Sequence, residues 1–191
     1  GLALEATTGV NPFQLGFIGS TDTHSATAGA AQERGYEGHL GRRDAQYRNV
    51  QDHFAANPGG LAVVWAEENS RDAIFNAIKR RETYATSGTR PQLRFFAGDY
   101  PQDICAEPDM LNTAYQRGVP MGSNLSVAED EKPTFLIAAQ QDPGTPGQPG
   151  NGIERIQIVK GWVDDEGVTQ ERVIDVLGKA QPGLGVDPLS C

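Results

Sequence analysis

An aspartate and a histidine stand two positions apart in the stretch FIGSTDTHSATAG, residues 17–29. In an extended segment, side chains two positions apart point to the same side, so Asp22 and His24 can aim at one point. A carboxylate and a neutral imidazole together suit Zn, Mn or Fe. The alternative is a loop in which Asp22 caps a short helix and His24 is merely polar. The spacing alone does not select between these two interpretations.

A second candidate site is the stretch TSGTR at residues 86–90, which follows a predicted strand. The hydroxyls of Thr86 and Ser87, the glycine backbone and the guanidinium fork of Arg90 suit a phosphate or a carboxylate. A plain turn with a solvated arginine explains the same residues equally well. The sequence therefore indicates an anion-binding loop here as one of two interpretations.

Four further residues could contribute to a site. His39 lies in a glycine-rich insertion and is either a lid residue or a solvated loop residue. His53 falls beside the apolar stripe of a predicted helix, which favours a boundary position over a ligand. Glu67 and Glu68 follow a predicted buried strand, where acids serve as ligands or support ligands. For Glu68 we favour the simpler interpretation of an acid preceding a helix.

The elements that must position these residues alternate in type over the first 90 residues. The run LAVVW predicts a strand buried on both faces, and Ser70 or Asn69 can cap the helix that follows it. That helix should pack Ile74 and Ile78 inward. Strand, helix and strand in this order predict a parallel, right-handed crossover. The expected elements are a strand at 13–18, a helix at 43–56, a strand at 61–65, a helix at 70–81 and a strand at 83–87.

After residue 90 the pattern changes to strands with little helix between them. A hairpin turn at 164–167 joins the last two strands, and one helix is expected near 108–118. The segment 142–152 is rich in Pro and Gly and predicts a flexible loop. The expected strands are 92–98, 134–140, 153–163 and 170–177. We therefore expect an antiparallel β region.

Composition excludes two classes of partner. The 191 residues carry a net charge of −9, whereas phosphate backbones require a cationic face, so we expect no nucleic acid. No stretch approaches the roughly 20 apolar residues that span a bilayer, so we expect no membrane insertion. Cys105 and Cys191 are either two unrelated thiols or a disulfide formed in an oxidising compartment. The chain lacks an initiator Met, so a periplasmic or secreted location stays open.

Three stretches carry a family resemblance, at residues 16–30, 57–98 and 153–167; the most specific part is AEENSRDAIFNAIKRRETYATSGTR. They resemble the C-terminal half of a bacterial domain-of-unknown-function family related to the PHP (polymerase and histidinol phosphatase) metallohydrolases. Such proteins are distorted barrels that hold two or three metal ions at their strand ends and hydrolyse phosphoesters. The resemblance implies that Asp22 and His24 are the last ligand motif of the metal cluster.

The fold that this resemblance implies is α/β. Residues 1–90 would be the C-terminal part of a PHP-like distorted (β/α) barrel, and residues 91–191 would be an appended antiparallel β region with an irregular tail. The implied function is metal-dependent hydrolysis of a small-molecule phosphoester through a metal-activated water. Asp22 and His24 would hold Zn, Mn or Fe, and Thr86, Ser87 and Arg90 would bind substrate.

The chain departs from the family pattern in its histidines. Family members carry a His-x-His motif and further ligands upstream, whereas this chain has only His24, His39 and His53. We therefore expect an upstream half of the same protein to supply the other ligands, and we expect the chain to depend on that half or to form homo-oligomers. The alternative function is a non-catalytic barrel scaffold with an incomplete metal site that binds a small molecule or a protein partner.

Overall fold

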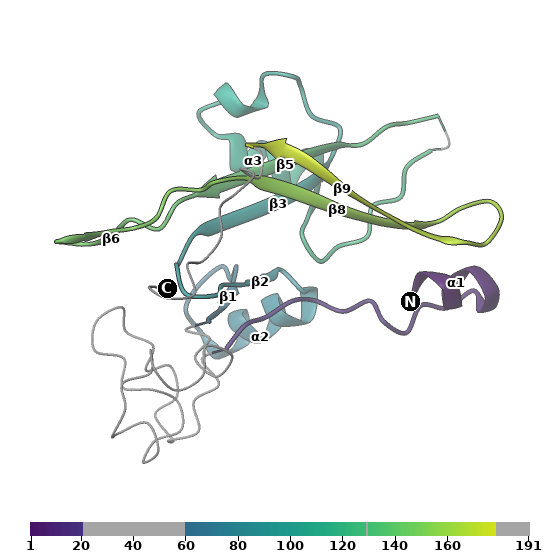
Figure 1. The fold of residues 1–191 in the computed structure, drawn as a ribbon, viewed down its shortest axis with the longest axis horizontal. Coiled ribbons are helices and arrows are strands. Elements are labelled where there is room, and N and C mark those ends of the chain that lie inside the picture. The colour runs from purple at the N-terminus through teal and green to yellow at the C-terminus, as the bar shows by residue number, and fades with distance from the viewer. Residues whose placement is uncertain (21–59, 129, 179–191) are drawn as a thin grey trace, which may run out of the picture. The chain divides into compact units, whose positions relative to one another are not determined.

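The computed structural model describes residues 1–20, 60–128 and 130–178, which form two compact units. One unit combines Gly1–Gln14 with the chain from Gly152 onward, and the other is Leu15–Asn151. Figure 1 shows both, and we describe each by itself. The predicted boundary near residue 90 stays a prediction.

The larger unit begins with two short strands that flank a helix. Strand β1 (Ala62–Val64) leads to α2 (Arg71–Arg80), and β2 (Thr83–Ala85) follows. The Ser70 side chain accepts a hydrogen bond from the backbone N–H of Ala73, which caps α2 as predicted. Arg81 ends the helix in the left-handed conformation, with φ of 62°. The helix and both strands therefore lie where the sequence predicts them.

The main sheet of this unit is antiparallel and has the order β4-β3-β5. The 3-10 helix η2 (Ile104–Ala106) and α3 (Met110–Arg117) connect β3 (Gln92–Gly98) to β4 (Gly118–Pro120), and β5 (Thr134–Gln140) follows β4 along the chain. A small ladder of β6 (Gly144–Thr145) and β7 (Gln148–Pro149) lies in the predicted Pro/Gly loop. The hydrophobic core of the sheet and its helices consists of Phe96, Tyr100, Ile104, Ala114 and Leu136.

The smaller unit is a long two-stranded hairpin with one short helix. Strands β8 (Ile156–Val163) and β9 (Thr169–Leu177) pair antiparallel, and α1 (Leu2–Thr8) contacts β8. The predicted turn is confirmed, because the Asp164 carbonyl accepts from the N–H of Gly167 and the Asp164 N–H donates to the Val168 carbonyl. Gly167 has φ of 79°, a conformation that glycine adopts at little cost.

The predicted α/β barrel is wrong. Within the described residues every strand pair is antiparallel, the sheets are small and none of them closes. The parallel crossover fails because the chain leaves β1 and enters β2 at the same end. There the Trp65 N–H donates to the Glu82 carbonyl at 3.0 Å, and Val64 faces Thr83 across the ladder. A helix whose two connections meet at one end returns the chain antiparallel.

Two local predictions are also wrong, and one cannot be compared. Residues 13–18 form no strand, and Phe17 is 78% exposed. In α2 Ile74 is half-buried and Ala77, on the same face, is fully buried, whereas Ile78 is 49% exposed, so only the inward placement of Ile78 is wrong. The small Ala77 side chain allows the closest approach on that face. The predicted helix at 43–56 lies outside the described residues.

Candidate functional site

The predicted anion-binding loop begins at the end of β2 and is fastened there by Thr86. The backbone N–H of Thr86 donates to the Leu61 carbonyl at 3.1 Å, and the Thr86 hydroxyl oxygen accepts from the Leu61 N–H at 3.0 Å. Thr86 is buried, whereas Ser87 and Arg90 are exposed. One of the three predicted substrate-binding residues therefore fixes the loop, and the other two are accessible from solvent.

The other end of this loop is fixed by the buried carboxylate of Asp142. Its Oδ2 accepts from the backbone N–H of Arg90 at 2.7 Å, and its Oδ1 accepts from the N–H of Gly144 at 2.8 Å. Hydrogen bonds from two backbone amides stabilise a buried carboxylate. Because both ends are tied, the backbone of residues 86–90 is positioned by hydrogen bonds rather than left to solvent.

The segment that precedes Asp22 lies beside the start of this loop. The Thr83 hydroxyl donates to the Phe17 carbonyl at 2.9 Å. A Cβ added to Gly60 would lie 2.9 Å from the Ser20 carbonyl oxygen and 2.8 Å from that of Thr86, closer than real Cβ contacts come. Three segments distant in sequence therefore approach each other at Ser20, Gly60 and Thr86, and only glycine fits at position 60.

The predicted metal ligands Asp22 and His24 lie outside the described residues, as do His39 and His53. Their roles stay predictions. Within residues 1–20, 60–128 and 130–178, no group of three or more His, Cys, Asp or Glu side chains could hold a metal ion. Glu67 and Glu68, the other acids considered, are exposed in the bend that precedes α2.

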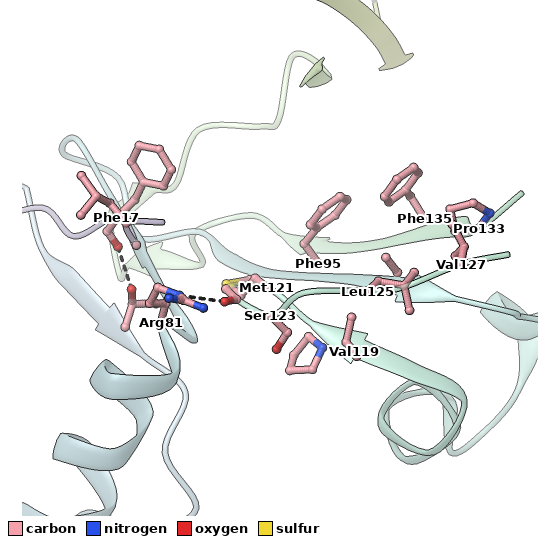
Figure 2. A pocket seen from close by; sticks show the side chains of 16 residues that line it. Phe17, Arg81, Phe95, Val119, Met121, Ser123, Leu125, Val127, Pro133 and Phe135 are labelled. Atoms are coloured by element: carbon pink, nitrogen blue, oxygen red, sulfur yellow. Dashed lines mark hydrogen bonds between the residues drawn. The ribbon is translucent and has the colours of Figure 1, made fainter. Parts of the chain in front are cut away.

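An apolar groove of about 500 Å³ crosses the sheet β4-β3-β5 (Figure 2). The rings of Phe95 and Phe135 stack along it, with centroids 5.6 Å apart and planes 4° from parallel. At the other end of the groove, Nε of Arg81 donates to the Gly122 carbonyl at 2.8 Å. Nearly all the side chains that line the groove are hydrophobic, so it is suited to an apolar group rather than to acid–base chemistry.

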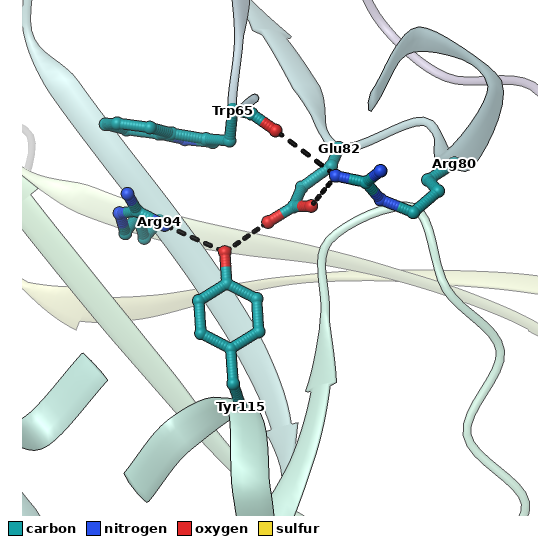
Figure 3. A network of polar contacts seen from close by, with 5 residues as sticks. All are labelled: Trp65, Arg80, Glu82, Arg94 and Tyr115. Carbon is teal, nitrogen blue, oxygen red and sulfur yellow. Dashed lines mark hydrogen bonds and ion pairs between the residues drawn. The ribbon is translucent and has the colours of Figure 1, made fainter. Parts of the chain in front are cut away.

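A buried polar network at the end of α2 was not predicted from the sequence (Figure 3). Glu82 is 4% exposed; its Oε2 pairs with Nη2 of Arg80 at 3.2 Å, and its Oε1 accepts from the Tyr115 hydroxyl. Nη1 of Arg94 donates to the same hydroxyl at 2.9 Å. The Arg94 guanidinium lies over the ring of Trp65, 3.6 Å from its centroid. Arg80, Arg94 and Tyr115 belong to α2, β3 and α3, and Trp65 and Glu82 lie next to β1 and β2. Because the members are so far apart in sequence, no local sequence pattern predicts the network.

Burial raises the pKa of three tyrosines in this unit. For Tyr84 and Tyr100 desolvation is the main cause. For Tyr115 desolvation is again the largest cause, and the hydrogen bond and negative charge of Glu82 raise the pKa further. A phenol beside a buried carboxylate resists ionisation, because its anion would face a second negative charge. We therefore assign Tyr115 a structural role as a neutral hydrogen-bond donor.

Two features bear on the compartment predictions. Cys105 is exposed and Cys191 lies outside the described residues, so both interpretations, two unrelated thiols or a disulfide, stay open. Among the residues that the structure describes, no helix is long and apolar enough to cross a membrane.

Comparison with known proteins gives one match. A family model described as "Protein of unknown function (DUF3604)" matches residues 1–183. Neither the curated proteins nor the solved structures gave a match.

Proposed function

Since the chain belongs to the DUF3604 family, whose description assigns no activity, we propose a function from its own residues and from its resemblance to PHP hydrolases. The chain is part of a metal-dependent hydrolase of small-molecule phosphoesters. Asp22 and His24 hold a divalent ion, and Ser87 and Arg90 bind the phosphate, with Thr86 fixing their loop.

The single observation that supports this proposal is the close approach of Ser20, Gly60 and Thr86. Asp22 and His24 follow Ser20 by two and four residues in the sequence. The motif that carries the metal ligands therefore starts within reach of the loop that carries Ser87 and Arg90.

The donor set of this region fits a hard or borderline divalent ion and an anionic substrate. A carboxylate and an imidazole are ligands for Zn, Mn and Fe. When bound, such an ion supplies an activated water and neutralises charge on the ester oxygens. Arg90 can form two parallel hydrogen bonds to phosphate oxygens, and the Ser87 hydroxyl can donate one more. The tied backbone of the loop fixes the positions from which these side chains extend.

Two protein ligands alone hold a divalent ion weakly, because catalytic zinc sites use three. We propose that an upstream half of the same protein supplies the remaining ligands. A second candidate function is a non-catalytic scaffold that binds a small molecule or a protein partner. The apolar groove along Phe95 and Phe135 favours this alternative, since it offers a binding surface without catalytic groups.

Metal content separates the two candidates. The protein with its upstream half should contain roughly two or three divalent ions per chain and hydrolyse bis(p-nitrophenyl) phosphate. His24→Ala should lower both metal content and activity, and Arg90→Gln should raise KM with the metal retained. Arg117→Gln is the matched control, because Arg117 pairs only with the exposed Asp99 among the described residues. Unchanged metal content in His24→Ala, or an unchanged KM in Arg90→Gln, contradicts the corresponding assignment.

A further inference from the structure

A second cavity, of about 390 Å³, lies between the face of β3 and β5 and the first turn of α3. Its walls are of two kinds. Leu111 of α3 and Ile137 of β5 form an apolar side, whereas Trp65 and Arg94 form an aromatic and cationic side. No carboxylate lines the cavity within the described part of the chain. An apolar wall that faces a single cation is typical of sites for small organic anions.

The cation of this cavity is held rigidly. The Trp65 indole N–H donates to the Leu93 carbonyl at 3.0 Å, which fixes the ring. Arg94 lies against that ring at 3.6 Å and donates Nη1 to the Tyr115 hydroxyl at 2.9 Å (Figure 3). A guanidinium has five N–H donors, and a planar partner on one face leaves its edge able to form a bidentate contact. Little side-chain entropy is then lost on binding an anion.

The charges around Arg94 leave one positive charge uncompensated. The nearest acid in the network is Glu82, and its Oε2 is already paired with Arg80 at 3.2 Å. Within residues 60–128 and 130–178 the ion pairs are Arg80–Glu82, Arg117–Asp99 and Arg155–Glu154, and Arg94 belongs to none of them. Two cations and one carboxylate therefore give the network a net charge of +1. In a chain of net charge −9, such a pocket is a local exception.

The rim of the cavity adds neutral hydrogen-bond donors. Gln92 and Gln140 are paired across the antiparallel ladder of β3 and β5, and both line the cavity. Each amide can donate two hydrogen bonds to an oxygen atom. The rim therefore provides neutral donors in addition to the charged donor of Arg94.

We propose that this cavity binds a small organic anion that carries one carboxylate on a compact apolar body. The carboxylate contacts Arg94 and the amides of Gln92 and Gln140, and the apolar body packs against Leu111 and Ile137. This inference uses neither Asp22 nor His24 and does not depend on the proposed hydrolase activity.

Titration with benzoate tests the proposal, with benzamide as the uncharged probe of the same shape. Calorimetry should show saturable binding of benzoate to the chain, about tenfold or more tighter than binding of benzamide, because the charged contact strengthens the hydrogen bonds. Gln140→Glu places a negative charge at the rim without touching Arg94 or Trp65, so it should weaken benzoate binding about tenfold. Arg117→Gln, which changes a surface charge away from the cavity, should leave binding unchanged.

Equal affinity for benzoate and benzamide, or no saturable binding of benzoate, would overturn the proposal. Benzoate binding that survives both Gln140→Glu and Gln92→Glu at full strength would overturn it too, since the anion would then lie elsewhere. Gln140 and Gln92 are both exposed, so neither variant disturbs the core. Urea denaturation of each variant checks that its fold is retained.

Discussion

Replacing Tyr115 by Phe removes one oxygen from the buried network and leaves the ring in place. The hydroxyl donates to Glu82 and accepts from Arg94 at 2.9 Å, while the ring meets Phe96 edge to face at a centroid distance of 5.0 Å. Phe keeps the ring contact. The variant therefore tests the polar contacts separately from the packing.

The expected loss of stability in Tyr115→Phe follows from the burial of Glu82. Its side chain is 5% exposed, so water cannot replace the lost donor, and only Arg80 remains as its side-chain partner in the network. Hydrogen bonds to charged groups contribute about 1.5–3 kcal/mol, and we expect Tyr115→Phe to lower the free energy of unfolding by that amount. The matched control is Tyr100→Phe, whose hydroxyl donates to the neutral Ala114 carbonyl at 3.1 Å. It should cost only about 0.5–1.5 kcal/mol.

Urea denaturation measures the free energy of unfolding of both variants, and the dependence of that free energy on urea concentration should be the same as in the wild type. If Tyr115→Phe costs less than about 0.5 kcal/mol, the network does not stabilise the fold and the burial argument is refuted. A double-mutant cycle with Glu82→Gln should then also show no coupling. If the argument holds, the cycle should show a coupling of about 1 kcal/mol or more.

Three further outcomes follow from the same unit, each read by urea denaturation. Ile78→Ala should cost less than about 1 kcal/mol, because this side chain is 49% exposed; a loss near that of a core isoleucine would contradict the placement of α2. Gly122→Ala should lower the free energy of unfolding by more than about 1 kcal/mol, because Gly122 has φ of 83° and a Cβ there would lie 2.3 Å from the Arg81 carbonyl oxygen. An unchanged stability would contradict this backbone conformation at Gly122. Stability should be full below pH about 10 and fall above it, because unfolded tyrosines ionise first whereas the three buried ones have raised pKa values in the folded state. In Tyr115→Phe this alkaline loss should be smaller, and an equal loss would mean that Tyr115 does not contribute to it.

Local elements were predictable because each is encoded by neighbouring residues. Strands β3 and β5 have the predicted bounds, at 92–98 and 134–140, and Ser70 caps α2 as expected. The turn at 164–167 follows from Asp and Gly chemistry that needs no distant partner. The direction in which two strands pair, by contrast, is not encoded by neighbouring residues. It depends on where a connection re-enters the sheet, and hydrophobic periodicity carries no information about that.

The polar network could not be predicted from the sequence either, because its side chains come from distant positions. Glu82 and Tyr115 are 33 residues apart, and Arg94 lies between them in sequence on another strand. Glu82 follows three basic residues, Lys79 to Arg81, so its local setting resembles a solvated surface. Its burial arises only when α3 packs beside β3 and brings the phenol of Tyr115 to it. The burial of Glu82 therefore depends on tertiary contacts and is not visible in the sequence around it.

The pairing of β1 and β2 also decides which residues can share a site. In a parallel arrangement, the ends of both strands would meet at one edge, and Glu67 would lie near the loop that begins at Thr86. In the antiparallel ladder, Ala62 faces Ala85 and Val64 faces Thr83. The end of β2 therefore lies beside the start of β1, and Thr86 meets Leu61 and Gly60 instead.

The antiparallel pairing separates Glu67 and Glu68 from the loop at Thr86 and places Ser20, in the segment that precedes Asp22, beside that loop. The acids follow the opposite end of β1, where Trp65 pairs with Glu82 through the backbone. Under the proposed assignment of Asp22 and His24 as metal ligands, we expect the further ligands to be residues other than these two acids. For the proposed hydrolase, the further ligands are then expected from the upstream half, and His24→Ala is the variant that tests the ligand assignment directly.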